Sequence, residues 1–256
     1  MNNYKKRNQK NKFEPIIVWH HHGSGKELNK INGYTVQARI DSGTQGTVYL
    51  ATKNGKKYAI KIYTDIKDPI AYNKEVECLK ALRDICGKDI VCFVENFELE
   101  NGDHVVVLEY LEGYVTLKKY LDDKFEEIEI DEETGDMDEN SIEKIAENLI
   151  LLKKIRNRLM KIIGVLRSHN VVHNDFRDEN ILIKETDDGK LKFKIIDFGM
   201  CKIFQKNFIN KDYEMLADML ISKMTYYYDS DTILSFAKCI LEKMDETPRN
   251  RILRYI

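Results

Sequence analysis

Two short stretches in the second half of the chain carry polar residues at a spacing that suits chemistry. His173–Leu182 reads H-N-D-F-R-D-E-N-I-L, so Asp175 is followed by a basic residue two positions later and by an amide five positions later. This pattern is rarely met by chance in a loop between a helix and a strand. Further along, Asp197-Phe198-Gly199 follows directly on an apolar run. A carboxylate held at a strand end beside a flexible glycine is a suitable ligand for a hard metal ion.

A glycine-containing stretch in the first half is suited to approach phosphate groups. Residues 41–48 read D-S-G-T-Q-G-T-V and lie between two strand-like segments. Gly43 and Gly46 carry no Cβ, so the backbone amides around them can come close to an anion, and Val48 can cover a flat base. An ordinary hairpin turn is the alternative interpretation of the same stretch.

A lysine occupies an otherwise apolar strand-like segment. Lys61 lies in Ala59-Ile60-Lys61-Ile62, where a buried ammonium without a partner would be costly. Glu75, in the helical segment that follows, is a candidate partner for an ion pair. An exposed strand lysine is the alternative.

The elements that must position these residues can be read from the hydrophobic spacing, because alternation predicts strands and three-to-four spacing predicts helices. In the first half we expect strands near 36–40, 48–50, 58–62, 91–98 and 104–110, a helix over 70–82 and a hairpin turn at Asn54-Gly55. In the second half we expect a long helix from Asn140, its N-cap, to near His169, strands at 181–184 and 192–196, and two last helices over 212–225 and 231–243. This order indicates an antiparallel sheet with one inserted helix, followed by a mainly helical region.

Composition and charge narrow the class of protein. The 256 residues are 43% hydrophobic, and 41 basic against 43 acidic side chains give a net charge of −2. This balance argues against a nucleic-acid-binding protein and against global disorder. No apolar run approaches the roughly 18 residues of a membrane span, and the N-terminus lacks a signal peptide, so we expect no membrane partner. The five cysteines are odd in number and form no C-x-x-C pair, which predicts a reduced chain in the cytoplasm.

Charge is concentrated at two places in the chain. Residues 1–12 carry five basic and no acidic side chains, and His20-His21-His22 follow. We expect a solvated basic extension over 1–32 and assign no metal site to the histidines. Residues 122–139 contain eleven acidic side chains and one lysine, which predicts a mobile surface insertion.

Taken in order, these motifs resemble those of the protein-kinase superfamily. A glycine-rich loop, a strand lysine, a helix glutamate, an H-x-D-x-x-x-x-N loop and D-F-G follow one another over about residues 33–225. The resemblance implies an α+β, bilobal protein-kinase-like fold, with an antiparallel β N-lobe that carries one helix and a reduced, mainly helical C-lobe. The expected boundaries are 33–111 for the N-lobe and 112–256 for the C-lobe, which includes the acidic insertion 122–139.

The resemblance also implies a role for each motif residue in binding ATP and Mg²⁺ or Mn²⁺. Ser42, Gly43 and Gly46 would cover the phosphates, which Lys61 would hold, oriented by Glu75 rather than by Glu77. Asp175 would orient the acceptor hydroxyl and accept its proton, Arg177 would lie near the γ-phosphate, and Asn180 and Asp197 would bind the metal. Backbone groups of Glu109, Tyr110 and Leu111 would meet the adenine beside Leu108, and Val48, Ala59 and Leu182 would enclose it. An apolar stack behind the site would contain Leu79, a residue at about Val94, His173 and Phe198.

Several positions depart from the pattern of the family. Asp41 stands where the first glycine of the loop is expected, and Asn174 stands where an arginine usually binds a phosphorylated activation segment. No Ser, Thr or Tyr occurs from Met200 to Lys211, and Asp212, which resembles the buried aspartate that opens a central helix, follows directly. These features predict a short activation segment that phosphorylation does not control.

The resemblance implies an ATP-dependent phosphotransferase, and three functions are consistent with it. The first is a Ser/Thr protein kinase acting on a protein substrate, because Arg177 occupies the position of the lysine found in kinases of that type. The second is a small-molecule kinase similar to aminoglycoside phosphotransferases, which the short segment favours. The third is a catalytically weak pseudokinase that acts as a binding module, which Asp41 favours. Some viral kinases are similarly minimal.

Overall fold

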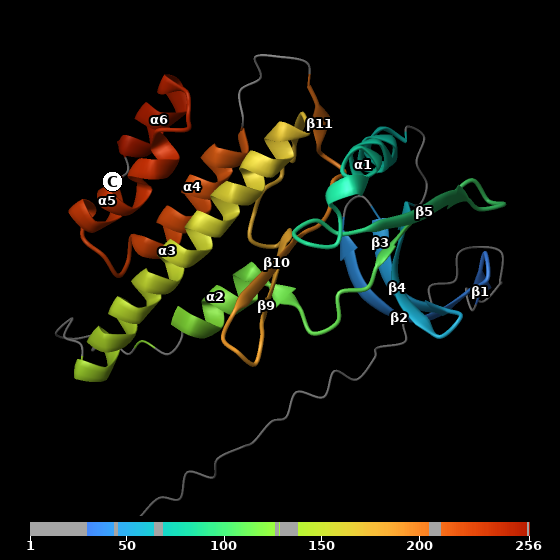
Figure 1. The fold of residues 1–256 in the computed structure, drawn as a ribbon, viewed down its shortest axis with the longest axis horizontal. Coiled ribbons are helices and arrows are strands. Elements are labelled where there is room, and N and C mark those ends of the chain that lie inside the picture. Colours follow the sequence, from blue (N-terminus) through green and yellow to red (C-terminus); the bar gives the residue numbers. More distant parts are fainter. Residues whose placement is uncertain are drawn as a thin grey trace, which may run out of the picture.

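In the computed structural model, the first half of the chain, where apolar and polar residues alternate, forms an antiparallel sheet at one end of the molecule (Figure 1). The structure describes residues 30–43, 46–63, 69–125, 128, 138–204, 211–254 and 256. The sheet contains β1 (Lys30–Ile31), β2 (Tyr34–Gly43), β3 (Gly46–Lys53), β4 (Lys56–Tyr63), β5 (Phe93–Glu98) and β6 (His104–Glu109). Its order is β1-β2-β3-β4-β6-β5. The predicted turn at Asn54-Gly55 joins β3 to β4, and both residues have the positive φ that this hairpin requires.

Strand β4 has a different environment on each of its faces. Ile60 and Ile62 belong to a small core within the sheet, whereas Tyr63 belongs to the main core. The main core also contains the buried face of α1 (Ile70–Ala81). Because successive side chains of a strand point to opposite faces, Lys61 lies on the same face of β4 as Tyr63 and is directed toward α1.

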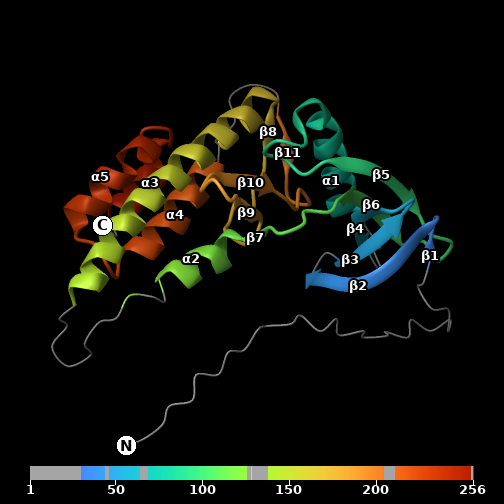
Figure 2. The ribbon, with the colours of Figure 1, turned by 60° about the horizontal axis from the view of Figure 1, so that its bottom comes forward.

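The second half of the chain is mainly helical. Its helices are α2 (Leu117–Phe125), α3 (Glu139–Ser168), α4 (Lys211–Met224), α5 (Ser230–Leu241) and α6 (Glu246–Leu253). Its strands are β7 (Val115–Thr116), β8 (Val171–Val172), β9 (Ile181–Glu185), β10 (Leu191–Ile195) and β11 (Lys202–Ile203). Figures 1 and 2 show α3 running along this part with α4 and α5 beside it, and β7, β9 and β10 lying toward the six-stranded sheet.

This architecture confirms the predicted fold class. It is α+β and bilobal, with an antiparallel N-lobe sheet that carries one α-helix and a C-lobe that is mainly helical. The lobe boundaries at 33–111 and 112–256 stay a prediction. Among the residues that the structure describes, no helix is both long and apolar enough to cross a membrane.

The long helix α3 begins two residues earlier than expected, because its N-cap is Asp138 instead of Asn140. Its N-cap is Asp138, whose carboxylate accepts the backbone N–H of Ser141 at 2.7 Å, so the predicted cap at Asn140 is wrong. An aspartate and an asparagine serve equally well as N-caps, and residue type alone does not choose between them. Near the start of the helix Ile142 is 57% exposed, whereas further along Leu152, Ile155, Leu159, Ile162 and Leu166 are buried.

Part of the acidic stretch 122–139 is helical rather than an insertion. Residues 122–125 form the end of α2, which packs through Leu117, Leu121 and Phe125. The four-residue spacing of these three side chains was obscured by the acidic residues around them. Residues 126–127 and 129–137 lie outside the described residues, as do residues 1–29 with the histidine triplet. The end of the expected basic extension 1–32 is part of the sheet instead, because Lys30–Ile31 form β1 and Ile31 is buried. Helix α6 was also missed by the sequence-based expectation.

Four of the five cysteines are paired. The structure contains the disulfides Cys78–Cys201 and Cys86–Cys92, and Cys239 is free. The prediction of a fully reduced chain is therefore wrong for this structure. Cys78 and Cys201 are 123 positions apart, so only the fold brings them together and no spacing motif marks them.

Candidate functional site

A buried lysine joins two carboxylates that come from different elements. Nζ of Lys61 lies 3.0 Å from Oε2 of Glu75 on α1 and 2.8 Å from Oδ1 of Asp197, which follows β10. The side chains of Lys61 and Glu75 are 7% and 1% exposed, whereas that of Asp197 is 36% exposed. The predicted pair of Lys61 and Glu75 is therefore present, and Asp197 forms the solvent-accessible edge of the cluster.

Helical spacing explains why Glu75, and not Glu77, meets the lysine. Glu75 lies three and four residues before Cys78 and Leu79, and all three are buried on one face of α1. Glu77 is exposed. The choice between the two glutamates thus follows from the period of the helix.

The sequence interpretation missed a second partner of Glu75. Tyr63 is 1% exposed, and its hydroxyl donates a hydrogen bond to Oε2 of Glu75. Its ring lies 4.9 Å from Nζ of Lys61 and packs edge-on against Tyr72. Burial, together with the Glu75 carboxylate, raises the pKa of Tyr63, so the hydroxyl keeps its proton. A tyrosine two positions after the strand lysine, on the same face of the strand, was the signal available for this contact.

The charges of the cluster stabilise one another against burial. Burial alone would lower the pKa of Lys61, but the carboxylates of Glu75 and Asp197 outweigh it and raise that pKa. Burial alone would raise the pKa of Asp197, but the Lys61 ammonium and the amide of Gly199 bring that pKa below its ordinary value. The cluster therefore holds two carboxylates against one ammonium.

The loop before β9 fixes a further carboxylate from two sides. Nδ2 of Asn180 donates to Oδ2 of Asp175 at 2.7 Å and to the backbone oxygen of Asp175 at 2.9 Å. Nε of Arg177 lies 3.3 Å from Oδ1 of Asp175. The structure thus brings Asp175, Arg177 and Asn180 together, and the Asp175 side chain stays 26% exposed.

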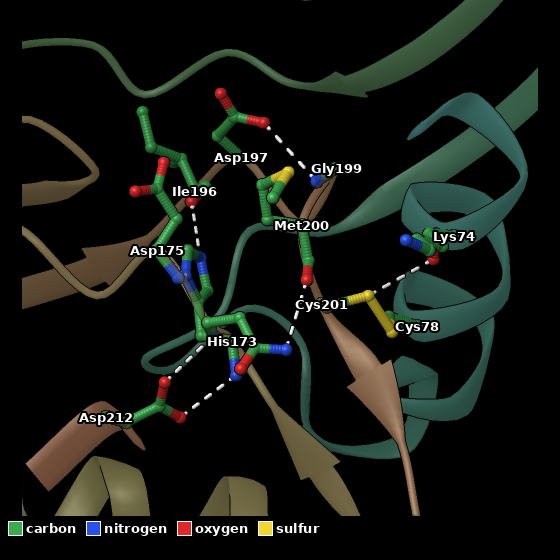
Figure 3. The surroundings of a disulfide bond; sticks show 11 residues. Lys74, Cys78, His173, Asp175, Ile196, Asp197, Gly199, Met200, Cys201 and Asp212 are labelled. Atoms are coloured by element: carbon green, nitrogen blue, oxygen red, sulfur yellow. Dashed lines mark hydrogen bonds between the residues drawn. A yellow bond between two sulfur atoms is a disulfide. The ribbon is translucent and has the colours of Figure 1, made fainter. Parts of the chain in front are cut away.

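Buried polar groups hold this loop in place (Figure 3). Asp212, in the first turn of α4, accepts the backbone N–H groups of His173 and Asn174, each at 2.9 Å. Nε2 of His173 lies 2.9 Å from the carbonyl oxygen of Ile196, so this nitrogen is the one that carries the proton. Burial raises the pKa of Asp212 even though His173 and the two amides oppose the shift. The predicted burial of Asp212 is confirmed, and the loop is linked to the residue just before Asp197.

Asn174 connects the same loop to the chain that follows Asp197. Its Nδ2 donates to the backbone oxygen of Met200 at 3.2 Å. Its φ is 62°, a left-handed conformation that asparagine tolerates better than most residues. The residue that departs from the family pattern therefore makes a direct contact with the short segment.

The expected apolar stack is present except at one position. The rings of His173 and Phe198 have centroids 4.8 Å apart, and both residues are buried, as is Leu79. Val94 is 40% exposed, so its place in the stack is wrong. The preceding residue, Phe93, packs against the main core instead, because a shift of one position along a strand moves a side chain to the other face.

Strands β2 and β3 pair with each other up to the glycine-containing loop, of which Thr44 and Gln45 lie outside the described residues. Gly43 pairs with Gly46, and Ser42 precedes them on the exposed end of β2. A Cβ at position 46 would clash with the backbone oxygen of Ile62, which is next to Lys61 on β4. The carboxylate of Asp41 accepts the N–H of Ser42 at 2.7 Å, so this acidic side chain is bound to its own loop.

Apolar candidates for enclosing a base come from both lobes. Val48 of β3 is paired with Lys61, and Ala59 of β4 is paired with Leu108 of β6. Leu182 lies on β9 in the C-lobe, and Leu111 packs against the main core. Val48, Ala59 and Leu182 are all half-buried.

Glu109 makes a contact that the sequence did not reveal. Lys194 of β10, whose side chain is 4% exposed, forms an ion pair with Oε1 of Glu109. The same oxygen accepts the backbone N–H of Cys92 at 2.9 Å, and Nζ of Lys194 lies 3.4 Å from the backbone oxygen of Ile90. This pair joins the end of β6 to the C-lobe sheet. Sequence reasoning had considered only the backbone of Glu109.

Asn180 and Asp197 form a donor set that fits Mg²⁺ or Mn²⁺. Among the described residues, no group of three or more His, Cys, Asp or Glu side chains could hold a metal ion. Magnesium in sites that handle phosphates needs only one or two carboxylates, with the remaining ligands from phosphate and water. Asp197 offers a partly exposed carboxylate of lowered pKa, and the amide nitrogen of Asn180 is bound to Asp175, which leaves the amide oxygen as a ligand.

Comparison with known proteins agrees with this geometry. A family model described as the protein kinase domain matches residues 34–243. Serine/threonine-protein kinase ksp1 of Schizosaccharomyces pombe is 32% identical over 183 residues, which are 68% of this chain and 34% of that protein. Probable serine/threonine-protein kinase zyg-1 of Caenorhabditis briggsae is 28% identical over 177 residues, which are 69% of this chain and 21% of that protein. The chain thus spans about a third or less of the length of these curated relatives. With its family model matched over most of its length, the chain belongs to the protein kinase domain family.

Proposed function

We propose that the protein is an ATP-dependent phosphotransferase, and specifically a Ser/Thr protein kinase. The observation that carries the proposal is the Lys61 ammonium held between Glu75 and Asp197, in a chain that also fixes Asp175 through Asn180. The similarity to kinases named as serine/threonine-specific supports this class of acceptor.

The nucleotide would bind between the hairpin loop and the β6–β7 connection. Backbone groups around Ser42, Gly43 and Gly46 would approach the phosphates, which the Lys61 ammonium would hold. Backbone groups of Glu109 and Leu111 would meet the adenine. Val48, Ala59 and Leu182 would enclose the base, because half-buried apolar side chains favour a flat aromatic ligand.

Asn180 and Asp197 would hold the magnesium or manganese ion that accompanies ATP. When bound, such an ion neutralises the charge that develops on the transferred phosphoryl oxygens. The lowered pKa of Asp197 keeps this carboxylate ionised for the role. Glu75 and Tyr63 act indirectly, because they fix the position of the Lys61 ammonium.

Asp175 would orient the acceptor hydroxyl and accept its proton. Its two carboxylate oxygens are held by Asn180 and Arg177, so the group has a fixed direction while its side chain stays partly exposed. Arg177 is 54% exposed and keeps a positive charge beside this carboxylate, where the γ-phosphate would lie. Correct placement of these groups supplies a large part of the rate enhancement in transfer reactions.

Activity would not depend on phosphorylation of the segment that follows Gly199. Residues 200–211 contain no Ser, Thr or Tyr, and Asn174 contacts the backbone of Met200 directly. A small hydroxyl compound is the second candidate acceptor, because only twelve residues separate Gly199 from Asp212, which leaves little chain for docking a peptide.

A panel of acceptors tests the proposal. The full chain is incubated with γ-labelled ATP, Mg²⁺ and either generic protein substrates or small hydroxyl and amino compounds, beside Asp175→Asn. We expect label on serine and threonine of protein acceptors, and background only with Asp175→Asn. Label on small compounds alone would favour the second candidate. If the wild type and Asp175→Asn give equal background labelling while ATP still raises the melting temperature, the result would favour a binding module and contradict the proposed enzymatic activity.

A further inference from the structure

The Cys78–Cys201 disulfide crosses between the two segments that carry the charges of the site (Figure 3). Cys78 lies on α1, three residues after Glu75, and Cys201 lies four residues after Asp197. Both cysteines are buried, at 1% and 0% exposed. The bond therefore links the helix that positions Lys61 to the strand-end segment that holds Asp197.

The segment after Asp197 is held on its other side by hydrogen bonds. Asn174 donates to the backbone oxygen of Met200, and β11 pairs with β8 beneath the catalytic loop. The backbone N–H of Phe204 donates to the oxygen of Asn170 at 2.9 Å. These contacts attach the segment to the C-lobe. The disulfide attaches the same segment to α1, which belongs to the N-lobe.

We propose that Cys78–Cys201 is a redox-controlled clamp that fixes α1, and with it Glu75, against the segment of Asp197. The consequence for activity rests on the proposed function. In the closed form, which contains the disulfide, a covalent bond beside the Lys61 cluster keeps Glu75 and Asp197 close together. In the open form, in which the bond is reduced, only non-covalent contacts such as the Lys61 ion pairs and the Tyr63 hydrogen bond to Glu75 hold the two carboxylates in place, and part of the correctly positioned population is lost.

The open form is expected to stay folded. Sγ of Cys201 lies 3.2 Å from the backbone oxygen of Lys74, so as a thiol it can donate a hydrogen bond to α1. The buried face of α1 also keeps its apolar contacts with the main core. Reduction therefore loosens the helix without removing the forces that dock it.

The partner of this site is a low-molecular-weight thiol–disulfide couple of the glutathione class. A thiolate attacks one sulfur of the bond, forms a mixed disulfide and releases the other cysteine as a thiol, and a second thiolate then frees the first cysteine. Two external thiols are oxidised to one disulfide while two electrons and two protons pass to Cys78 and Cys201. Because both sulfurs are buried, the attacking thiolate reaches them only when α1 moves away, which couples exchange to helix position.

The other disulfide provides a matched control. Cys86 and Cys92 are six positions apart and close a loop between α1 and β5 that contacts Ile195 before Asp197, so their bond does not cross to the segment that follows Asp197. Cys86→Ser/Cys92→Ser removes that bond alone. Cys201→Ser removes the clamp but keeps a hydroxyl beside the Lys74 oxygen, and Cys78→Ser removes it from the side of α1.

The test equilibrates the full chain with glutathione mixtures of increasing oxidation. Mass spectrometry measures the Cys78–Cys201 linked peptide, hydrogen exchange measures the amides of 72–81 and 198–204, and labelled ATP measures transfer. We expect linkage to appear with oxidation, exchange in both segments to slow by about tenfold, and transfer to rise by about tenfold, which is less than the roughly 10²-fold that a misplacement of about 1 Å can cost. Cys78→Ser and Cys201→Ser should lose all three responses, and Cys86→Ser/Cys92→Ser should keep them.

Three results would overturn the clamp: no linked peptide in any mixture, equal exchange with and without the link, or a response that survives in Cys78→Ser. Redox-dependent linkage and exchange without transfer in any mixture would support the clamp and overturn the proposed function. The two failures are therefore distinguishable.

Discussion

Two lysines are buried on strands of this protein, and they differ in what surrounds their charge. Lys61 on β4 is 7% exposed and meets two carboxylates, Glu75 and Asp197. Lys194 on β10 is 4% exposed and meets the carboxylate of Glu109 and the backbone oxygen of Ile90. The first cluster carries an excess of negative charge and the second pairs one charge with one. An excess at a partly exposed edge is what a divalent cation can neutralise, whereas a balanced pair is complete without a ligand.

The surroundings of Lys194 are also joined by backbone hydrogen bonds and a further ion pair. Next to it, Ile195 donates its N–H to the oxygen of Asp89 at 2.8 Å and accepts the N–H of Val91 at 3.1 Å. Arg158 of α3 forms an ion pair with the side chain of Asp89. The Lys194 pair therefore belongs to a junction between the lobes. Of the two clusters, the one around Lys61 has the unbalanced and accessible charge that suits a divalent cation.

The largest expected effect is the loss of transfer in Lys61→Met. Removal of the ammonium should lower kcat by about 10²–10³-fold, as removal of one electrostatic group from a reaction site does. Steady-state kinetics with labelled ATP measures it. Lys56→Met, at an exposed position of the same strand, is the control and should retain full activity. Equal activity of Lys61→Met and its control would contradict a catalytic role for the Lys61 cluster.

Lys194→Met should act on stability and nucleotide affinity more than on turnover. Without the ammonium, Glu109 loses its charged partner, which should lower the free energy of unfolding by about 2 kcal/mol, less than for a pair with both members fully buried. Glu109 is 31% exposed, which is why the smaller value is expected. Urea denaturation measures the loss, and the double variant with Glu109→Gln should recover part of it.

The kinetic signature of Lys194→Met separates the clusters further. The KM for ATP should rise by a few-fold while kcat changes little, because a shift of the β6 end alters binding of the base and leaves the transferring group in place. Lys192→Met, at an exposed position of the same strand, is the control. A fall in kcat as large as that of Lys61→Met would contradict a purely positioning role.

Tyr63→Phe tests the second support of Glu75. The ring and its packing are kept while the hydrogen bond to a buried carboxylate is lost, so unfolding should require about 1–2 kcal/mol less free energy. kcat should fall by a few-fold because Lys61 is less well oriented. Thermal denaturation and steady-state kinetics measure the two effects. Tyr58→Phe, on the same strand, should change neither, and equal losses in both variants would deny Tyr63 a specific role.

The smallest effect concerns pH. The pKa of Asp197 is lowered in the folded protein from an ordinary value of 3.8, so its contribution to stability is present above that value and is lost as the pH falls through the folded pKa. The free energy of unfolding, measured with urea, should therefore fall more steeply below pH 3.8 in the wild type than in Asp197→Asn. Parallel curves for the two proteins would show that Lys61 does not favour the ionised Asp197.

The sequence predicted one of the two lysine clusters and not the other, for physical reasons. Lys61 stands in a recognisable series of motifs, and helical spacing selects Glu75 over Glu77. Lys194 stands in L-K-F-K-I, where alternation would leave both lysines on one face, yet Lys192 is exposed and Lys194 is buried. Its partner comes from another strand in another lobe, and only tertiary packing determines that pairing.

The same distinction holds elsewhere in the fold. Long periodic elements such as α3 were predicted from their spacing, whereas its cap at Asp138 and the strand position of Val94 depended on single-residue register. The Cys78–Cys201 bond was missed because nothing local identifies two cysteines brought together by a folded core. Sequence therefore predicted the residues that a motif marks, and missed those that act through long-range contacts.

The most direct test of the account is the single-turnover rate of phosphoryl transfer from ATP in Asp175→Asn. The substitution keeps the size of the side chain but removes the carboxylate that would accept the proton of the acceptor. Asp187→Asn, in the exposed turn between β9 and β10, is the matched control. We predict a loss of about 10²–10⁴-fold in Asp175→Asn, with ATP and Mg²⁺ still raising its melting temperature, and no loss in Asp187→Asn. Equal transfer rates in the wild type and Asp175→Asn would contradict the account.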